Sequence, residues 1–254
     1  AEACIVFVPS GGEEQFHSGL KESLNGPLEW LKDSGVLKDF PGKAGSTLLA
    51  YHPGGADKVL LPRVILVGLG PLEESDTSAF QSALRNGAAS AVALARSYSL
   101  ESVGIDPKNL EGLPLASEAL LQEFVLAANS GSYAYTSLKS VQEAEIAFPR
   151  RVVIFFDEQP TAAQETALKE GLAEYVGLAL ARDLVNGPSN LVTPEHMAHA
   201  AQELAETYDY GISVLTPPEM QEMSMGAMEA VFRGSANPAR LGILDSAPDS
   251  SWRW

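Results

Sequence analysis

The sequence predicts an α/β fold in which helices flank a mixed sheet. Three apolar segments have the length and composition of strands: Ala3–Val8, Val59–Gly70 and Arg151–Asp157. Segments with helical spacing lie between them, and strands that alternate with helices are typical of layered α/β domains. Residues 64–67 form a continuous apolar run, which indicates a central strand covered on both faces.

The other amino-terminal elements follow from local signals. Residues 10–57 are loop-rich, with many Gly and Pro; Leu28–Leu37 is a candidate for a short helix, and the local signals leave the rest of the stretch open. Thr77–Tyr98 is rich in alanine and repeats apolar residues at helical spacing, and Ser117–Asn129 has one apolar helical face. Ser102–Ile105 is expected to be a short strand between these two helices.

A long helix over Thr161–Val185 is predicted next, and its length suggests a connector between domains. The turn Asn186-Gly187-Pro188 ends it, because glycine tolerates left-handed backbone angles and proline cannot continue the helical hydrogen bonds. Thr193 is expected to cap a helix that runs to Tyr208, with proline at its first position. Strands over Gly211–Leu215 and Leu241–Asp245 and a short helix over Pro218–Met223 complete the prediction.

The charge balance argues against two classes of partner. The 254 residues include 33 acidic and 17 basic side chains, which gives a net charge of −16. Phosphate backbones and anionic membrane surfaces would be repelled, so we expect no nucleic-acid and no membrane partner. The single cysteine, Cys4, is expected to be buried on a strand. No bilayer-spanning run or signal peptide is apparent, and the predicted location is cytoplasmic.

The glycine pair in VGLG, Gly68 and Gly70, raises the alternative of a nicotinamide-dependent enzyme. A dinucleotide fingerprint needs a third glycine at the start of a helix. Here Pro71, Glu73 and Glu74 follow instead, where phosphates would lie. A turn that ends a strand is therefore the preferred interpretation.

Other candidate chemistry also has an ordinary structural explanation. His196 and His199 could face one metal from a helix, but their surroundings are acidic and the HExxH pattern is absent, so a solvent-facing pair is expected. No GxSxG nucleophile motif occurs. His17 and His52 are expected in loops without evident partners. Four methionines are expected mainly to fill the core: Met220, Met223, Met225 and Met228.

Two runs carry a resemblance to a known family. ARDLVNGPSNLVTPEHMAHAAQELA begins at Ala181, and GISVLTPPEMQEMSMGAMEAVFRGSANPARLGILD begins at Gly211. Together they resemble the leucyl (cytosol) aminopeptidase family, which has an ARDLVN-P-N-TP run and an MGA-AV--GS--P-RL run. The resemblance extends more weakly to VILVGLG and to GSYAYTSLKS at 131–140.

The resemblance implies a domain plan and a chemistry. Residues 1–160 would be a macro-like amino-terminal domain, 161–185 a linker helix, and 186–254 the beginning of an α/β catalytic domain that is incomplete. The family's enzymes are usually homo-hexamers that remove amino-terminal residues from peptide substrates. Two divalent metal ions, zinc or manganese, activate the attacking water in them.

The family's metal ligands, a Lys, several Asp and a Glu, begin in a run like VGKG-TFD-GG that follows the strand matching Leu241–Asp245. The present sequence ends with SAPDSSWRW, before such a run. No residue corresponds to a catalytic, cofactor-binding or metal-ligating position, so all three sets of site residues are expected to be none. We expect the chain to be inactive alone. The alternative is a non-catalytic binding or oligomer-assembly module of macro-domain type.

Overall fold

The computed structural model describes residues 1–12, 16–25, 28–54, 62–72, 77–138, 140, 149 and 151–246. The chain divides into two compact units, residues 1–180 and 181–254. The first unit contains a five-stranded sheet and most of the buried core, and the second contains a two-stranded sheet. No helix among the described residues is long and apolar enough to cross a membrane.

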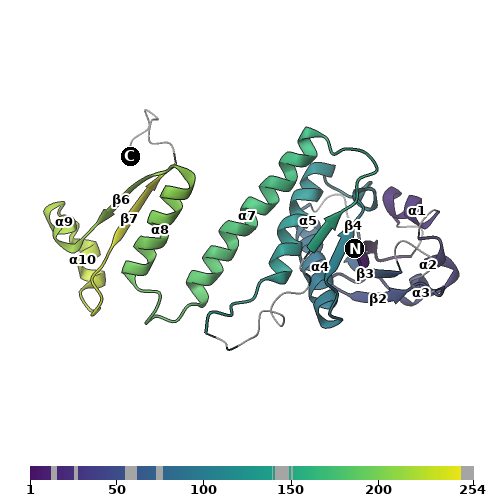
Figure 1. Cartoon of the computed structure of the whole chain (residues 1–254), viewed down its shortest axis with the longest axis horizontal. Helices are drawn as coiled ribbons and strands as arrows, with labels where there is room; N and C mark the ends of the chain where they lie inside the picture. Colours follow the sequence, from purple (N-terminus) through teal and green to yellow (C-terminus); the bar gives the residue numbers. More distant parts are fainter. Residues whose placement is uncertain are drawn as a thin grey trace. The chain divides into compact units, whose positions relative to one another are not determined.

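The sheet of the first unit has the strand order β2-β3-β1-β4-β5 (Figure 1). Its parallel strands are β1 (Ala3–Pro9), β3 (Arg63–Gly70), β4 (Ser102–Ile105) and β5 (Arg151–Ile154). The fifth strand, β2 (Thr47–Tyr51), pairs antiparallel with β3. The predicted mixed sheet is therefore confirmed.

Both faces of the central strands are buried, as the continuous apolar runs predict. Ile5 and Phe7 of β1 pack with Ile65 of β3 in a core cluster that includes two long helices, α4 (Thr77–Ser97) and α5 (Ser117–Ser132). Cys4 and Val6, which alternate with these residues, pack in a second cluster on the opposite face. Burial of Cys4 is confirmed, and it raises the pKa of the thiol to about 12.

Short helices cover the second face: α1 (Ser18–Leu24), α2 (Trp30–Asp33) and α3 (Val36–Asp39). The single helix predicted over Leu28–Leu37 is wrong, because Gly35 at φ +73° separates α2 from α3. In the rest of the loop-rich stretch 10–57, which the sequence left open, the structure has α1 and β2. The predicted strand from Val59 begins at Arg63 in the structure, and Val59 itself lies outside the described residues.

The long helix α7 (Ala162–Asn186) confirms the predicted helix within one residue at each end. Its start is capped reciprocally, since the Thr161 backbone N–H donates to Gln164 Oε1 (2.9 Å) and the Gln164 N–H donates to Thr161 Oγ1 (3.2 Å). Gly171 lies against α5, where an added Cβ would be 2.5 Å from the Gln122 carbonyl oxygen. Glycine at this position therefore permits close contact between the two helices.

The second unit contains α8 (Pro194–Tyr208), and α8 contacts an antiparallel pair, β6 (Gly211–Leu215) and β7 (Leu241–Asp245). The predicted cap is confirmed, since Thr193 Oγ1 accepts a hydrogen bond from the His196 N–H (3.3 Å). Two short helices lie between the strands, α9 (Pro217–Glu222) and α10 (Gly226–Phe232), and the second of these is absent from the prediction.

Candidate functional site

One cavity of the first unit lies where two parallel strands end. Asp106 follows β4 directly, and Phe155, Phe156 and Asp157 follow β5. Since parallel strands end at the same edge of a sheet, these residues are brought together although they are about 50 positions apart in sequence. They line a cavity of about 360 Å³. The edge at the carboxyl ends of strands is where open α/β sheets usually bind ligands.

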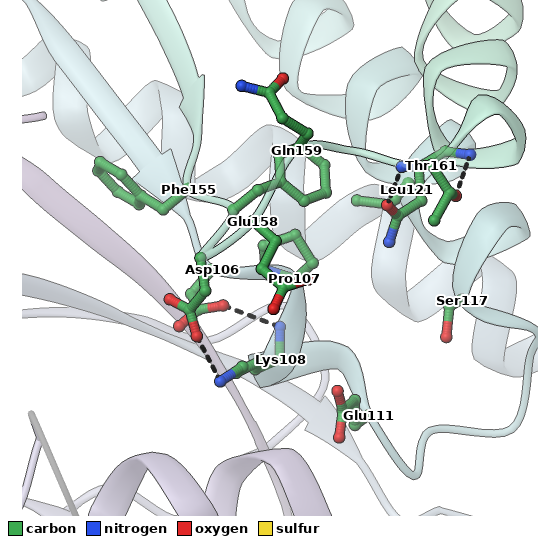
Figure 2. A pocket seen from close by; sticks show the side chains of 13 residues that line it. Asp106, Pro107, Lys108, Glu111, Ser117, Leu121, Phe155, Glu158, Gln159 and Thr161 are labelled. Atoms are coloured by element: carbon green, nitrogen blue, oxygen red, sulfur yellow. Dashed lines mark hydrogen bonds and ion pairs between the residues drawn. The ribbon is translucent and has the colours of Figure 1, made fainter.

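Two helices complete the cavity wall. A short 3-10 helix, η2 (Pro107–Leu110), contributes Lys108, and Ser117 lies at the first position of α5. Figure 2 shows Asp106 with Lys108 on one side of the cavity, and Ser117 with Thr161 on the other. The cavity is therefore formed by segments that follow β4 and β5.

Carboxylates dominate the electrostatics of this cavity. The Lys108 ammonium pairs with Asp157 Oδ2 at 2.5 Å, and this hydrogen bond raises the pKa of Lys108. Burial raises the pKa of Asp106; its hydrogen bond from the Lys108 backbone N–H (2.9 Å) opposes that shift, and nearby Asp157 adds to it. Glu111 and Glu158 add two further carboxylates to the lining. The cavity therefore attracts cationic groups and repels phosphates.

These residues were not singled out from the sequence, although a signal was present. Both SVGI and RVVIFF are strand-like runs followed by aspartate, at 106 and 157. Only the parallel pairing of β4 with β5 brings the two aspartates to one edge. The acidic residues considered with VGLG, Glu73 and Glu74, lie outside the described residues.

The turn interpretation of VGLG is confirmed. β3 ends at Gly70, which has φ +78°. Gly68 lies so close to the loop before β2 that an added Cβ would be 2.0 Å from the Lys43 carbonyl oxygen. These glycines permit close packing of the end of β3 against residues 42–46.

The histidines have partners that the sequence did not indicate. His17 lies outside the helices and strands, as predicted, but the expectation that it lacks partners is wrong: it is buried at the start of α1, with Nδ1 3.3 Å from the Leu20 backbone nitrogen. His52 also lies outside the helices and strands, as predicted, but it has a partner, since its ring contacts Trp30 edge to face with centroids 5.3 Å apart. On α8, Glu195 pairs with Arg240 (2.5 Å) and lies 3.7 Å from His199, an exposed side chain.

The methionine run is less buried than expected. Met220 is in the core with 1% exposure, but Met223 and Met228 are exposed by 58% and 37%. The core interpretation is therefore confirmed for Met220 and wrong for these two.

The family's pair of divalent metal ions needs a set of ligand side chains that converge on one place. Within the part of the chain that the structure describes, no three His, Cys, Asp or Glu side chains are grouped so that they could hold a metal ion. The described residues therefore do not fit a dinuclear centre, and we assign no chemical step to one here.

Comparisons with known proteins agree on one family. The family model described as the N-terminal domain of the cytosol aminopeptidase family matches residues 5–142, and the model of that family's catalytic domain matches residues 179–252. A probable cytosol aminopeptidase of Oleidesulfovibrio alaskensis is 36% identical over 220 residues, which is 86% of this chain and 41% of the relative. One from Syntrophobacter fumaroxidans is 32% identical over 253 residues, which is 100% of this chain and 48% of the relative.

Solved structures show the same fold. A mutant of tomato leucine aminopeptidase matches with a TM-score of 0.71 at 23% identity. The match covers 94% of this chain and 46% of the tomato enzyme. The bottromycin maturation enzyme BotP matches with the same TM-score and the same identity. That match covers 96% of this chain and 46% of the BotP chain. A further BotP structure is a complex with Mn. The chain thus spans less than half the length of these relatives and structures.

Proposed function

Because the chain belongs to the cytosol aminopeptidase family, we propose that it supplies the amino-terminal part of a leucyl aminopeptidase-type metallopeptidase. Residues 1–160 are its macro-like domain, 161–185 its linker helix, and 186–254 the beginning of its catalytic domain. The two family-model matches, in the same order along the chain, carry this proposal. The cytoplasm is the proposed compartment, in keeping with relatives that are called probable cytosol aminopeptidases.

In the complete enzyme, the proposed reaction is hydrolysis of the peptide bond after the first residue of a peptide. Two divalent cations, zinc or manganese, supply the activated water in the family, and a BotP structure contains manganese. No catalytic, cofactor-binding or metal-ligating residue is proposed in residues 1–254. The absence of a converging donor set among the described side chains supports this assignment.

The chain alone is therefore proposed to be inactive, and the test is direct. Purified 254-residue chain is incubated with leucyl p-nitroanilide and manganese, beside the full-length Oleidesulfovibrio alaskensis relative. Release of p-nitroaniline at the blank rate is expected for the chain, and turnover is expected for the relative. Turnover by the chain that a chelator abolishes would contradict its assignment as a part without catalytic residues.

The alternative role is that of a non-catalytic module. It has two versions: nucleotide binding and assembly of oligomers. The cavity after β4 and β5 is rich in carboxylates, which opposes the nucleotide version. Exposed apolar side chains on α7 favour assembly, since Leu172 and Val176 are about half exposed, at 49% and 46%. On the basis of these exposed side chains we propose that the chain forms homo-oligomers. The family resemblance suggests that the oligomer is a hexamer. Analytical ultracentrifugation of the chain and of Val176→Glu tests it, with a smaller species expected for the variant.

A further inference from the structure

The strand β5 forms one edge of the five-stranded sheet. It pairs with β4 on one side, and no strand among the described residues pairs with its other side. All four of its residues are exposed or partly exposed, whereas Val103 and Ile105 of the neighbouring β4 are fully buried. The apolar run continues through Phe155 and Phe156, which are also partly exposed. An apolar edge of this kind is a surface to which a further strand can add.

The backbone of β5 offers hydrogen-bonding groups for such an addition. The Arg151 N–H donates to the Glu101 carbonyl (3.2 Å), and the Phe155 N–H donates to the Ile105 carbonyl (2.9 Å). Because the N–H groups of successive residues in a strand point to alternate sides, those of Val152 and Ile154 point away from β4. The carbonyl groups of these two residues point to the same side as their N–H groups. The outer side of β5 therefore presents both donors and acceptors.

The charges at the two ends of this segment complement each other. Residues 151–157 read RVVIFFD, with a cation at one end, an anion at the other and five apolar residues between them. Arg151 is exposed, and 71% of the Asp157 side chain is exposed. If two copies pair antiparallel about Ile154, Arg151 of each copy lies opposite Asp157 of the other. The apolar residues 152–156 then lie opposite the same residues of the second copy.

The same charges select one register. A centre at Val153 would place Arg151 opposite Phe155, and a centre at Phe155 would place Arg151 opposite Gln159. Of these three registers, the one centred at Ile154 forms two ion pairs between the copies. Ile154 has its N–H and its carbonyl on the outer side, so the two Ile154 residues can exchange both hydrogen bonds. Backbone and side chains therefore favour the same register.

Asp157 already has one partner, which leaves room for a second. Lys108 Nζ pairs with Asp157 Oδ2 at 2.5 Å, and the exposed carboxylate keeps Oδ1 for a guanidinium group. Arg151 of the same chain is too distant, because six residues of extended strand span about 20 Å. An ion pair between Arg151 and Asp157 therefore joins two copies of the chain.

We infer that the outer side of β5 is a docking surface for a second copy of this chain, with the two strands antiparallel about Ile154 and an Arg151–Asp157 ion pair at each end. Both copies use the same edge, so the contact is closed by a two-fold axis and gives a dimer rather than an open chain. It joins the two sheets into one continuous sheet. The exposed apolar side chains of α7, Leu172 and Val176, take no part in it.

Sedimentation velocity of the 254-residue chain with Val176→Glu tests the contact, because this reference chain lacks the contact proposed on α7. A dimer in equilibrium with monomer is expected. Arg151→Asp and Asp157→Arg, each added to the reference chain, should raise the dimer dissociation constant at least about tenfold, because the two-fold axis creates two like-charge contacts. The control is Arg233→Asp, an exposed position in the second unit, which should keep the reference value.

An equimolar mixture of the Arg151→Asp and Asp157→Arg chains should restore the dimer. In the mixed dimer, the segment with two acidic ends lies opposite the segment with two basic ends, so both contacts are attractive again. The double variant Arg151→Asp, Asp157→Arg should also form dimers, because its charges are exchanged but still complementary. A monomeric reference chain, a dimer that Arg151→Asp leaves unchanged, or a mixture that stays monomeric would overturn the proposal.

Amide hydrogen exchange of the reference chain needs no charge variant and covers the case in which one of them does not fold. Protection of the Val152 and Ile154 amides should rise with chain concentration, because their N–H groups enter the contact. The Phe155 amide, which donates to Ile105, should be protected alike at every concentration. Exchange of Val152 and Ile154 that does not depend on concentration would overturn the proposal as well.

Discussion

Arg85 on α4 and Glu123 on α5 form a two-point ion pair between the helices that cover one face of the sheet. Arg85 Nη2 donates to Glu123 Oε1 at 2.7 Å, and Nε donates to Oε2. The Glu123 side chain is largely buried, at 11% exposure, whereas that of Arg85 is half exposed. The hydrogen bond to Glu123 raises the pKa of Arg85. Loss of the arginine would therefore leave a buried carboxylate whose remaining side-chain contact, within the described part of the chain, is Gln81 Nε2 at 3.5 Å.

Arg85→Met is expected to destabilise the chain by about 2 kcal/mol, because a buried charge loses its partner while water still reaches part of the site. The double variant Arg85→Met, Glu123→Met should regain at least half of that loss, since no charge is left unpaired. Urea unfolding of the single and double variants measures both values. A double variant less stable than Arg85→Met would contradict the explanation.

Gly19 tests the close packing of α1 on η2, and Gly177, which lies in an open position of α7, is the control. Gly19→Ala is expected to destabilise by about 3 kcal/mol or more, because its methyl group would overlap the Lys108 carbonyl oxygen. At Gly177, inside α7, an added Cβ meets nothing within 4 Å. Gly177→Ala should therefore stabilise by about 0.5–1 kcal/mol through helix propensity. Thermal unfolding of both variants is the measurement, and equal effects would show that the close contact does not exist in solution.

Local patterns were sufficient for the central part of the fold. The apolar run at residues 64–67 indicated a strand covered on both faces, and Thr193 with Pro194 fixed the start of α8. The strand β2 was missed because it is a short edge strand among glycines, and its evidence is its pairing with β3. The acidic cavity was missed for a related reason, since Asp106 and Asp157 meet only through the parallel pairing of β4 with β5. The roles of His17 and His52 also depend on contacts distant in sequence.

The buried thiol of Cys4 predicts a loss of stability in alkali. The unfolded chain ionises this thiol near its ordinary pKa of 9.0, while burial holds the folded pKa at about 12. The unfolded state therefore binds fewer protons between these values, and stability falls by up to about 1.4 kcal/mol per pH unit. Cys4→Ala has no thiol and should lack this loss. The unfolding free energy of the wild type should therefore fall toward that of the less stable Cys4→Ala between pH 9 and pH 10.5. An unchanged difference between the two proteins would mean that the thiol is accessible in the folded chain.

Manganese gives a test of the ligand assignment that does not depend on activity. A site filled at a hundred times its dissociation constant stabilises a protein by about 2.7 kcal/mol. No group of His, Cys, Asp or Glu side chains that could hold a metal occurs among the described residues, and two of their carboxylates are already paired, Asp157 with Lys108 and Glu195 with Arg240. Addition of manganese should therefore leave the unfolding free energy of the 254-residue chain unchanged.

The control for that measurement is Glu195→Gln, which removes the carboxylate that lies nearest to His199 on α8. Wild type and variant should respond alike to manganese, because neither has a converging donor set among the described residues. Chelator-reversible stabilisation of the wild type would contradict the assignment of no metal ligand to this chain. Its loss in Glu195→Gln would then locate the ligands on α8, because substitution of one ligand removes most of the affinity of a site built from few side chains.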